Sequence, residues 1–228
     1  MAETFADRFM SQFFLDGLNA TQERLDVKEA LRTYFDTDAR GYTGSQFESL
    51  IKDSDPFKIT ATDLVAITTL SVKVPERAAL WILSPEGGEQ ISKILREIPM
   101  DTDIWDPKVK NIFADDGKVM DLWRLLENAN WPTARKGGGL GGTTKRSKIM
   151  AAKRPRLIPI LDRVVVGSLL QTDNTWRAIQ DVLNVESYRS KLEEALKHDG
   201  VPPSVSLLRR IDVVIWFNNQ ATFRKKKK

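Results

Sequence analysis

Residues 135–163 have the sequence RKGGGLGGTTKRSKIMAAKRPRLIPILDR, and this stretch is the most informative part of the chain. A glycine-rich turn is followed by a basic segment that is compatible with a helix, and then by a link bounded by prolines. The window holds nine Lys and Arg residues, and Asp162 is its only acid. Glycines that expose backbone N–H groups beside cations suit a phosphate backbone, so nucleic acid is the first partner that we expect.

The glycine turn is typical of a helix-hairpin-helix element, in which two short helices flank a Gly-hydrophobic-Gly turn. The first helix would be 118–129 or a short turn just before the glycines. The second helix would start near Thr143 or Thr144, whose hydroxyl groups can cap it. A flexible linker is the alternative interpretation. The predicted DNA-binding residues are Gly139, Gly141, Gly142, Thr143, Thr144, Lys145, Arg146 and Lys148, with Trp131 as an aromatic contact.

Working outward from this window, apolar residues recur at helical spacing along most of the chain, and few segments alternate as strands do. The sequence therefore predicts an all-α fold. Thr60 and Asp63 have the spacing of a capping box, and Pro75 and Pro85 each suit the start of a helix. The predicted helices are 5–18, 22–35, 46–51, 63–72, 76–83, 86–98, 118–129, 145–152, 163–170, 175–183, 187–197 and 204–217.

The charge of the chain is divided unevenly along its 228 residues. Residues 1–130 carry 15 basic and 23 acidic side chains, a net charge of −8, whereas 131–228 carry 20 basic and 8 acidic, a net charge of +12. We predict one helical domain over 1–220, with an acidic half (1–130) and a basic half (131–220) that binds a polyanion. Two differently solvated faces of one domain are the alternative. The tail 221–228 is predicted to be disordered.

Residue types exclude several kinds of chemistry. The absence of cysteine removes disulfides, iron–sulfur clusters and thiol nucleophiles, and the only histidine, His198, lies at an expected helix end. Reactions would therefore use carboxylates, Lys or Tyr. No apolar run approaches the length of a membrane span, and the N-terminus is unlike a signal peptide, so a cytoplasmic location and no membrane partner are expected.

The spacing between the hairpin and the acid is similar to that of the helix-hairpin-helix DNA glycosylase superfamily, which has the endonuclease III-like fold. In that family an Asp follows the hairpin by about twenty residues and opens the next helix in a V-D-x-x-V context. Here Asp162 lies 20 residues after Gly142, within I-L-D-R-V-V. The resemblance spans roughly 138–166. It implies a glycosylase-like helical domain that binds double-stranded DNA, with Asp162 as the catalytic carboxylate.

The resemblance implies a monofunctional enzyme that hydrolyses the N-glycosidic bond of a damaged or modified base, in repair or in phage defence. Bifunctional members carry a Lys two residues after the last hairpin glycine, where this chain has Thr143 or Thr144, so lyase activity is not expected. No cofactor is expected, although the hairpin is compatible with a monovalent cation, and no metal site is predicted. A non-catalytic DNA-binding module and a protein-interaction domain remain as alternatives.

A second resemblance covers most of the chain. The strings YTGSQFE, ITATDLVAITTLSVKVPERAALWIL, KRPRLIPILDRVV and VSLLRRIDVVIW are similar to an uncharacterised bacterial family, a domain of unknown function. This similarity implies a single domain and supplies no mechanism.

Two aspartates have competing interpretations. Asp162 is also a natural N-cap for the helix that follows it, which is compatible with a catalytic role. Asp212 lies in an apolar helix, so its carboxylate needs a partner, and Arg209, Arg210 or a basic residue from elsewhere can supply one. The alternative for Asp212 is a second carboxylate of the site.

Overall fold

The computed structural model describes residues 2–15, 17–36, 42–130 and 139–225, and these residues form α-helices joined by turns and short 3-10 helices. The β-structure in this part of the chain is one isolated bridge between Phe14 and Glu23. The predicted all-α class is therefore confirmed. The helices are α1 (Phe5–Met10), η1 (Gly17–Asn19), α2 (Leu25–Phe35), η2 (Thr43–Gln46), α3 (Phe47–Ile51), α4 (Ala61–Thr69), α5 (Glu76–Leu83), α6 (Pro85–Glu97), η3 (Pro107–Val109), α7 (Lys118–Glu127), α8 (Thr143–Lys153), α9 (Arg163–Ser168), α10 (Thr175–Asn184), α11 (Glu186–Ala195) and α12 (Leu207–Lys225).

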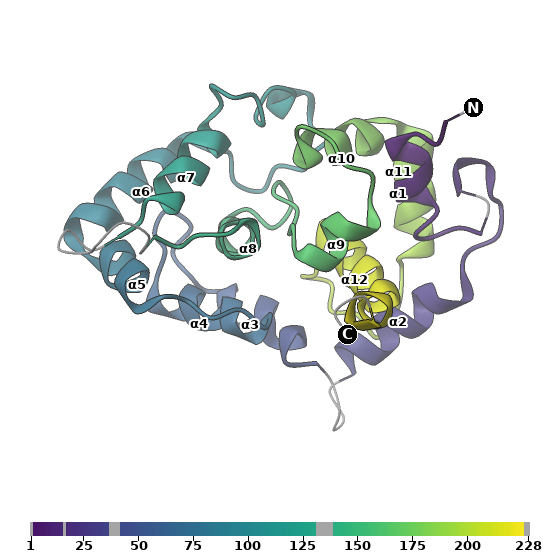
Figure 1. Cartoon of the computed structure of the whole chain (residues 1–228), viewed down its shortest axis with the longest axis horizontal. Coiled ribbons are helices and arrows are strands. Elements are labelled where there is room, and N and C mark those ends of the chain that lie inside the picture. The colour runs from purple at the N-terminus through teal and green to yellow at the C-terminus, as the bar shows by residue number, and fades with distance from the viewer. Residues whose placement is uncertain (1, 16, 37–41, 131–138, 226–228) are drawn as a thin grey trace.

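The helices form two groups with α8 between them. Figure 1 shows α8 end-on near the middle, with α3–α7 on one side and α1, α2 and α9–α12 on the other. Helix α8 packs against α3, α4 and α7, whereas α12 packs against α2 and α9. The core runs through both groups. A helix in this position must find partners for every polar group that it carries.

Helix α8 is buried along most of its length. Every residue from Arg146 to Lys153 is buried, including three cations, of which Arg146 and Lys148 are predicted from the sequence to bind DNA. The apolar run Ile149–Ala152 supplies hydrophobic contacts. These contacts do not offset the desolvation free energy of burying the charges of Arg146, Lys148 and Lys153. Each of these cations therefore needs protein partners.

Lys153 finds its partners at the start of α4. Its Nζ forms an ion pair with Asp63 at 2.5 Å and donates to the Ser54 hydroxyl at 2.7 Å. Asp63 is fully buried and completes the predicted capping box of α4, in which it accepts the Thr60 N–H at 2.7 Å. One carboxylate thus caps α4 and neutralises a cation of α8, which ties the central helix to the first group.

Arg154, the residue after α8, reaches the end of α6. Its guanidinium donates to the backbone carbonyls of Leu95 and Ile98, and to that of Pro56 at 2.8 Å. The Leu95 and Ile98 carbonyls lie at the C-terminus of α6 and have no partners within that helix, so a cation stabilises them. Burial lowers the pKa of Arg154 to about 10, and the charge of Asp101 opposes that shift.

The ends of two helices differ from the sequence prediction. Helix α1 stops at Met10 rather than continuing to residue 18, because the chain turns back and the Arg24 N–H donates to the Phe13 carbonyl at 2.8 Å. Helix α12 continues to Lys225, so residues 221–225, predicted to be disordered, belong to it. Elsewhere the predicted helices match the structure to within a few residues.

We expect Lys153→Met to lower the free energy of unfolding by about 3 kcal/mol or more, because it leaves the Asp63 carboxylate buried without its cation. Arg156→Met is the matched control, because Arg156 pairs with Asp103 at a half-exposed position. That substitution should cost about 1 kcal/mol or less. Urea unfolding of both variants measures the difference, and equal losses would contradict the importance of the buried pair.

Candidate functional site

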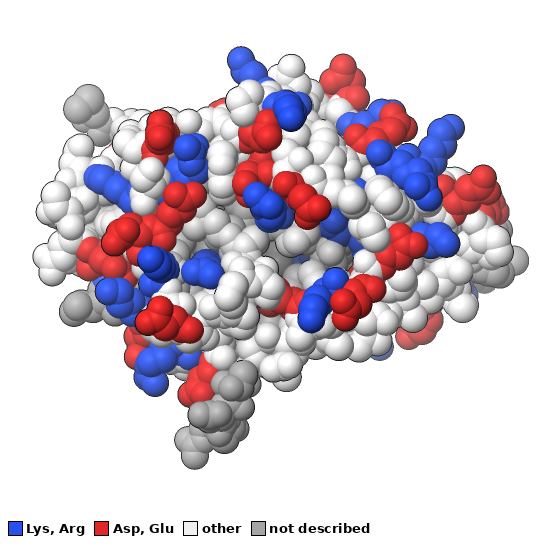
Figure 2. All heavy atoms as spheres, turned by 180° about the vertical axis from the view of Figure 1, so that it is seen from behind, with Lys and Arg blue, Asp and Glu red and all other residues white. Residues whose placement is uncertain are grey.

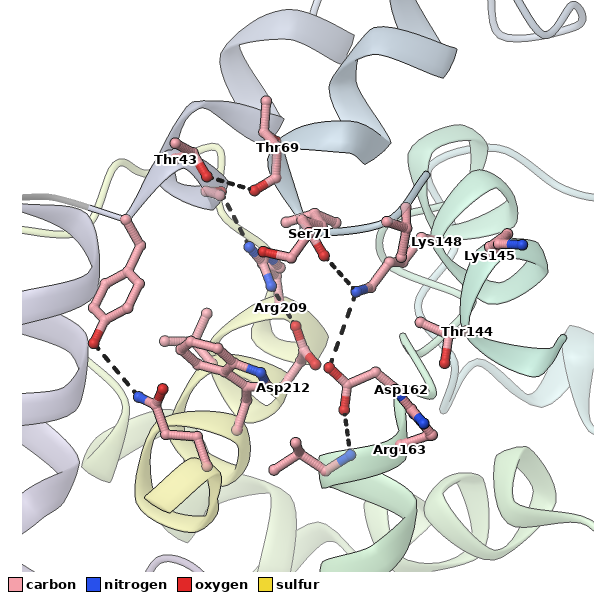
Figure 3. Close-up of a pocket in the computed structure, with 18 of the residues that line it drawn as sticks. Thr43, Thr69, Ser71, Thr144, Lys145, Lys148, Asp162, Arg163, Arg209 and Asp212 are labelled. Atoms are coloured by element: carbon pink, nitrogen blue, oxygen red, sulfur yellow. Dashed lines mark hydrogen bonds and ion pairs between the residues drawn. The ribbon is translucent and has the colours of Figure 1, made fainter. Parts of the chain in front are cut away.

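The described residues form a pocket of about 690 Å³ where the starts of α8 and α9 meet the end of α4 and one face of α12. Figure 3 shows the side chains of several elements converging on it. Its lining residues come from segments spread over the whole chain. They are Tyr34, Tyr42, Thr43, Gly44, Thr69, Leu70, Ser71, Val72, Lys73, Gly142, Thr143, Thr144, Lys145, Lys148, Asp162, Arg163, Val164, Arg209, Asp212, Val213, Trp216 and Gln220.

The predicted hairpin supplies one wall of this pocket. Gly141 and Gly142 have φ angles of 53° and 58°, which is the left-handed region that glycine adopts without strain. Gly142 is the N-cap of α8, and no side chain caps the helix, so the predicted caps by the hydroxyls of Thr143 or Thr144 are wrong. The N–H groups of the first turn therefore lack a side-chain partner at the pocket wall.

Gly139 is required for a different reason. A Cβ atom at this position would lie 2.0 Å from the backbone oxygen of Glu127, near the end of α7. Close backbone approach, rather than a phosphate contact, accounts for this glycine in the structure. Gly139 is not among the residues that line the pocket. Trp131, the predicted aromatic contact, lies outside the described residues.

Arg146 faces away from the pocket, which differs from its predicted role in DNA binding. Its guanidinium lies 3.7 Å from the centre of the Trp123 ring and forms an ion pair with Glu127 at 3.2 Å. Both partners belong to α7, so Arg146 joins α8 to α7. Burial lowers the pKa of Arg146, and the charge of Glu127 opposes that shift. Its place in the structure leaves the side chain unavailable to a ligand in the pocket.

Lys145 and Lys148 both line the pocket, but at different depths. Lys145 is half-buried, whereas Lys148 is buried and its Nζ donates to the Leu70 carbonyl at 2.7 Å. The same Nζ lies 3.9 Å from the Asp162 carboxylate. Burial lowers the pKa of Lys148, and the charge of Asp162 opposes that shift. The sequence therefore located both lysines correctly along the helix without indicating which one is buried.

Asp162 caps α9 and lines the pocket with the same carboxylate. Its Oδ1 accepts the backbone N–H groups of Val164 and Val165 at 2.8 and 2.9 Å, and its Oδ2 faces Lys148. Ser147 of α8 accepts the Leu161 N–H at 3.0 Å, which fixes the residue just before Asp162. The predicted N-cap is confirmed, and its carboxylate is held in a defined orientation within a pocket.

Asp212 forms the predicted ion pair, and its partner is Arg209. Both side chains are buried and both line the pocket. Arg209 also donates to Glu48 at 3.0 Å, to the Tyr34 hydroxyl at 2.6 Å and to the Gly44 carbonyl at 3.1 Å. These bonds hold the guanidinium in one orientation and bring α2, η2 and α3 to the pocket side of α12.

An aromatic cluster forms a further part of the pocket wall. The rings of Tyr34 and Tyr42 stack, with centroids 5.2 Å apart and an interplanar angle of 11°. Trp216 meets both rings edge-on, at 6.0 Å from Tyr34 and 5.4 Å from Tyr42. The pocket therefore combines an aromatic wall with a charged one, a combination that suits a planar ligand carrying negative charge.

Positive charge is concentrated at this pocket. Its lining includes five cations (Lys73, Lys145, Lys148, Arg163 and Arg209) and two carboxylates, Asp162 and Asp212. Figure 2 shows one face of the molecule, on which acidic and basic side chains are intermingled.

In the part of the chain that the structure describes, no group of three or more His, Cys, Asp or Glu side chains is placed to hold a metal ion. No helix found there has the length and apolar character of a membrane span.

Several pocket residues were not identified from the sequence. Tyr34, Tyr42, Lys73, Arg209 and Trp216 come from four separate segments, none of which carries a motif of known chemistry. Arg209 was considered only as a partner of Asp212. The buried charged pair in the string LLRRIDVVIW was the one local signal that pointed toward this side of the pocket.

We expect Asp162→Ala to lower the free energy of unfolding by about 1 kcal/mol, because two N–H groups of α9 lose their acceptor. Asp162→Asn retains an oxygen that can accept these N–H groups, so its loss of unfolding free energy should be only a few tenths of that of Asp162→Ala. Denaturant unfolding at neutral pH measures both variants. If Asp162→Ala is as stable as Asp162→Asn, the cap is not stabilising. A stable Asn variant provides the tool for separating capping from chemistry.

Comparison with known proteins identifies a family for this chain but no activity. A family model described as a family of unknown function (DUF6308) matches residues 27–219, which include all four strings that resemble an uncharacterised family. No curated protein matches the chain, and no solved structure matches it. The link to helix-hairpin-helix glycosylases therefore stays a prediction. Because the family model spans most of the sequence, the protein belongs to the DUF6308 family, whose function is unknown.

Proposed function

We propose that this protein binds double-stranded DNA and hydrolyses the N-glycosidic bond of a damaged or modified base, without lyase activity. One observation carries this proposal: the carboxylate of Asp162 faces a pocket that is rimmed by cations and bordered by the start of α8. A carboxylate that only capped α9 would not need to face a cavity of this size.

The pocket has dimensions and walls that suit a single extruded nucleotide. Its volume of about 690 Å³ lies within the range of small-molecule sites. Lys73, Lys145 and Arg163 would contact the phosphates around the extruded nucleotide. The Tyr42 and Trp216 rings supply apolar and aromatic surface for a base. A base inside a duplex is inaccessible, so the reaction requires the nucleotide to leave the stack.

Asp162 would act on the sugar. Breaking the bond between the base and the anomeric carbon builds positive charge on the sugar, and a fixed carboxylate nearby stabilises that charge. The two N–H bonds that Asp162 accepts from α9 prevent its side chain from rotating away. The same carboxylate can accept a proton from the attacking water. The proposed reaction involves no cofactor.

Binding is tested by measuring duplex affinity at several salt concentrations. We expect a steep salt dependence, and we expect Lys145→Met and Lys73→Met each to reduce the slope of log K against log salt by about 0.9. Lys93→Met is the matched control, because Lys93 is exposed on α6, which contributes no residue to the pocket. Absence of duplex binding would exclude both the enzyme and the DNA-binding module.

Activity is tested by counting abasic sites that form in duplexes carrying a panel of modified bases. The wild type should release at least one of these bases, and Asp162→Asn should release it about a hundredfold more slowly or less, while binding the duplex equally well. If both proteins bind duplex DNA and neither releases a base, the chain is a non-catalytic DNA-binding module.

A further inference from the structure

A second carboxyl group shares the pocket with Asp162. Asp212 projects from α12, and Figure 3 shows its carboxyl group and that of Asp162 pointing toward one another. Lys148 lies beside them, with its Nζ 3.9 Å from Asp162. The two acids are 50 residues apart in the sequence and belong to different helices. Their convergence on one cavity therefore results from the packing of α9 against α12.

The two carboxyl groups have different environments. Asp162 accepts two backbone N–H bonds at the start of a helix, where a negative charge is favoured. Asp212 is buried in α12 and has no backbone N–H bond of this kind among its hydrogen bonds. Two acids that share one site but have different hydrogen-bond partners and burial can take different roles in one reaction.

Charged neighbours of Asp212 shift its pKa in both directions. Burial raises the pKa of Asp212 to about 6, the Arg209 guanidinium opposes the shift, the charge of Asp162 adds to it and Lys148 opposes it. Tyr34 and Glu48 face the same Arg209 from α2 and α3. The positive charge of Arg209 is therefore shared among several partners, which leaves the burial of Asp212 only partly compensated.

We propose that Asp212 is the proton donor of the pocket, and that it protonates the departing base while Asp162 stabilises the sugar. This inference rests on the proposed function and adds a second catalytic residue to it. It also assigns a role to Arg209, which is a positioning residue: its bonds to Glu48, Tyr34 and Gly44 fix the guanidinium that holds Asp212.

The proposed reaction balances in protons and electrons. As the bond between the base nitrogen and the anomeric carbon breaks, its electron pair leaves with the base, and the base takes the proton from Asp212. Asp162 stabilises the resulting sugar cation. Water adds to the anomeric carbon and transfers a proton to Asp162, which passes it to solvent, and Asp212 regains a proton from solvent. The net reaction is hydrolysis to a free base and an abasic sugar.

The test compares two leaving groups in the full-length protein. A base that departs as an anion, such as hypoxanthine, needs a proton donor, whereas 7-methylguanine already carries a positive charge and leaves as a neutral molecule. We expect Asp212→Asn to slow single-turnover release of hypoxanthine about a hundredfold. Release of 7-methylguanine should change less than threefold, and Asp212→Glu should restore part of the loss.

The pH profile gives a second readout of this role. Asp212 donates only in its protonated form, so hypoxanthine release by the wild type should fall about tenfold per pH unit above pH 6. This limb should be absent in Asp212→Asn and shifted in Asp212→Glu. Equal losses on both bases, or a profile unchanged by the substitution, would overturn the inference and leave the proposed function standing.

A carboxyl titration followed by NMR, with ¹³C-labelled aspartate, separates the two proposals. A resonance that titrates near pH 6 should be present in the wild type and missing in Asp212→Asn. If the wild type releases no base of the panel, the proposed hydrolysis fails, and with it the donor role. If Asp212 instead stays ionised down to pH 4, the inference fails whatever the outcome for base release. Circular dichroism and unfolding curves establish that each variant is folded.

Discussion

The burial of a basic helix at the centre of the molecule is the constraint on which the rest of the structure depends. Helix α8 carries Arg146, Lys148 and Lys153 into the interior, and charges in that position are tolerated only when each has partners. Arg146 contacts the Trp123 ring and pairs with Glu127. Lys153 pairs with Asp63 and donates to Ser54. Lys148 donates to the Leu70 carbonyl. These contacts fix α7 and α4 around α8.

The same requirement shapes the pocket. Lys148 is the one α8 cation whose carboxylate neighbour, Asp162, borders the cavity. Because Asp162 also caps α9, the position of its carboxylate is fixed by the fold and does not depend on a bound ligand. On the opposite side, Arg209 joins α12 to the first helices and holds Asp212 at the same cavity. A site with two acids of different environment therefore arises from contacts that also stabilise the fold.

The local sequence was sufficient to predict most of the helices. The capping box of Thr60 and Asp63, the helix that starts at Pro85 and the N-cap at Asp162 depend on residues within a few positions of one another. Helix ends that depend on distant contacts were missed, such as the end of α1, where Arg24 bonds back to the turn. The basic character of α8 was recognised, but its burial was not, because the partners of its cations lie on other helices.

The sequence by itself determined that the chain is helical, that a glycine turn precedes α8 and that Asp162 opens a helix, since each depends on neighbouring residues. Only the tertiary structure decided that Arg146 turns to α7 while Lys145 and Lys148 face a cavity. It also decided that Tyr34, Tyr42, Asp212 and Trp216 meet at that cavity. The physical reason is that buried charges pair, and aromatic rings pack, between segments that lie far apart in the chain. Local sequence patterns do not indicate which distant segments come into contact.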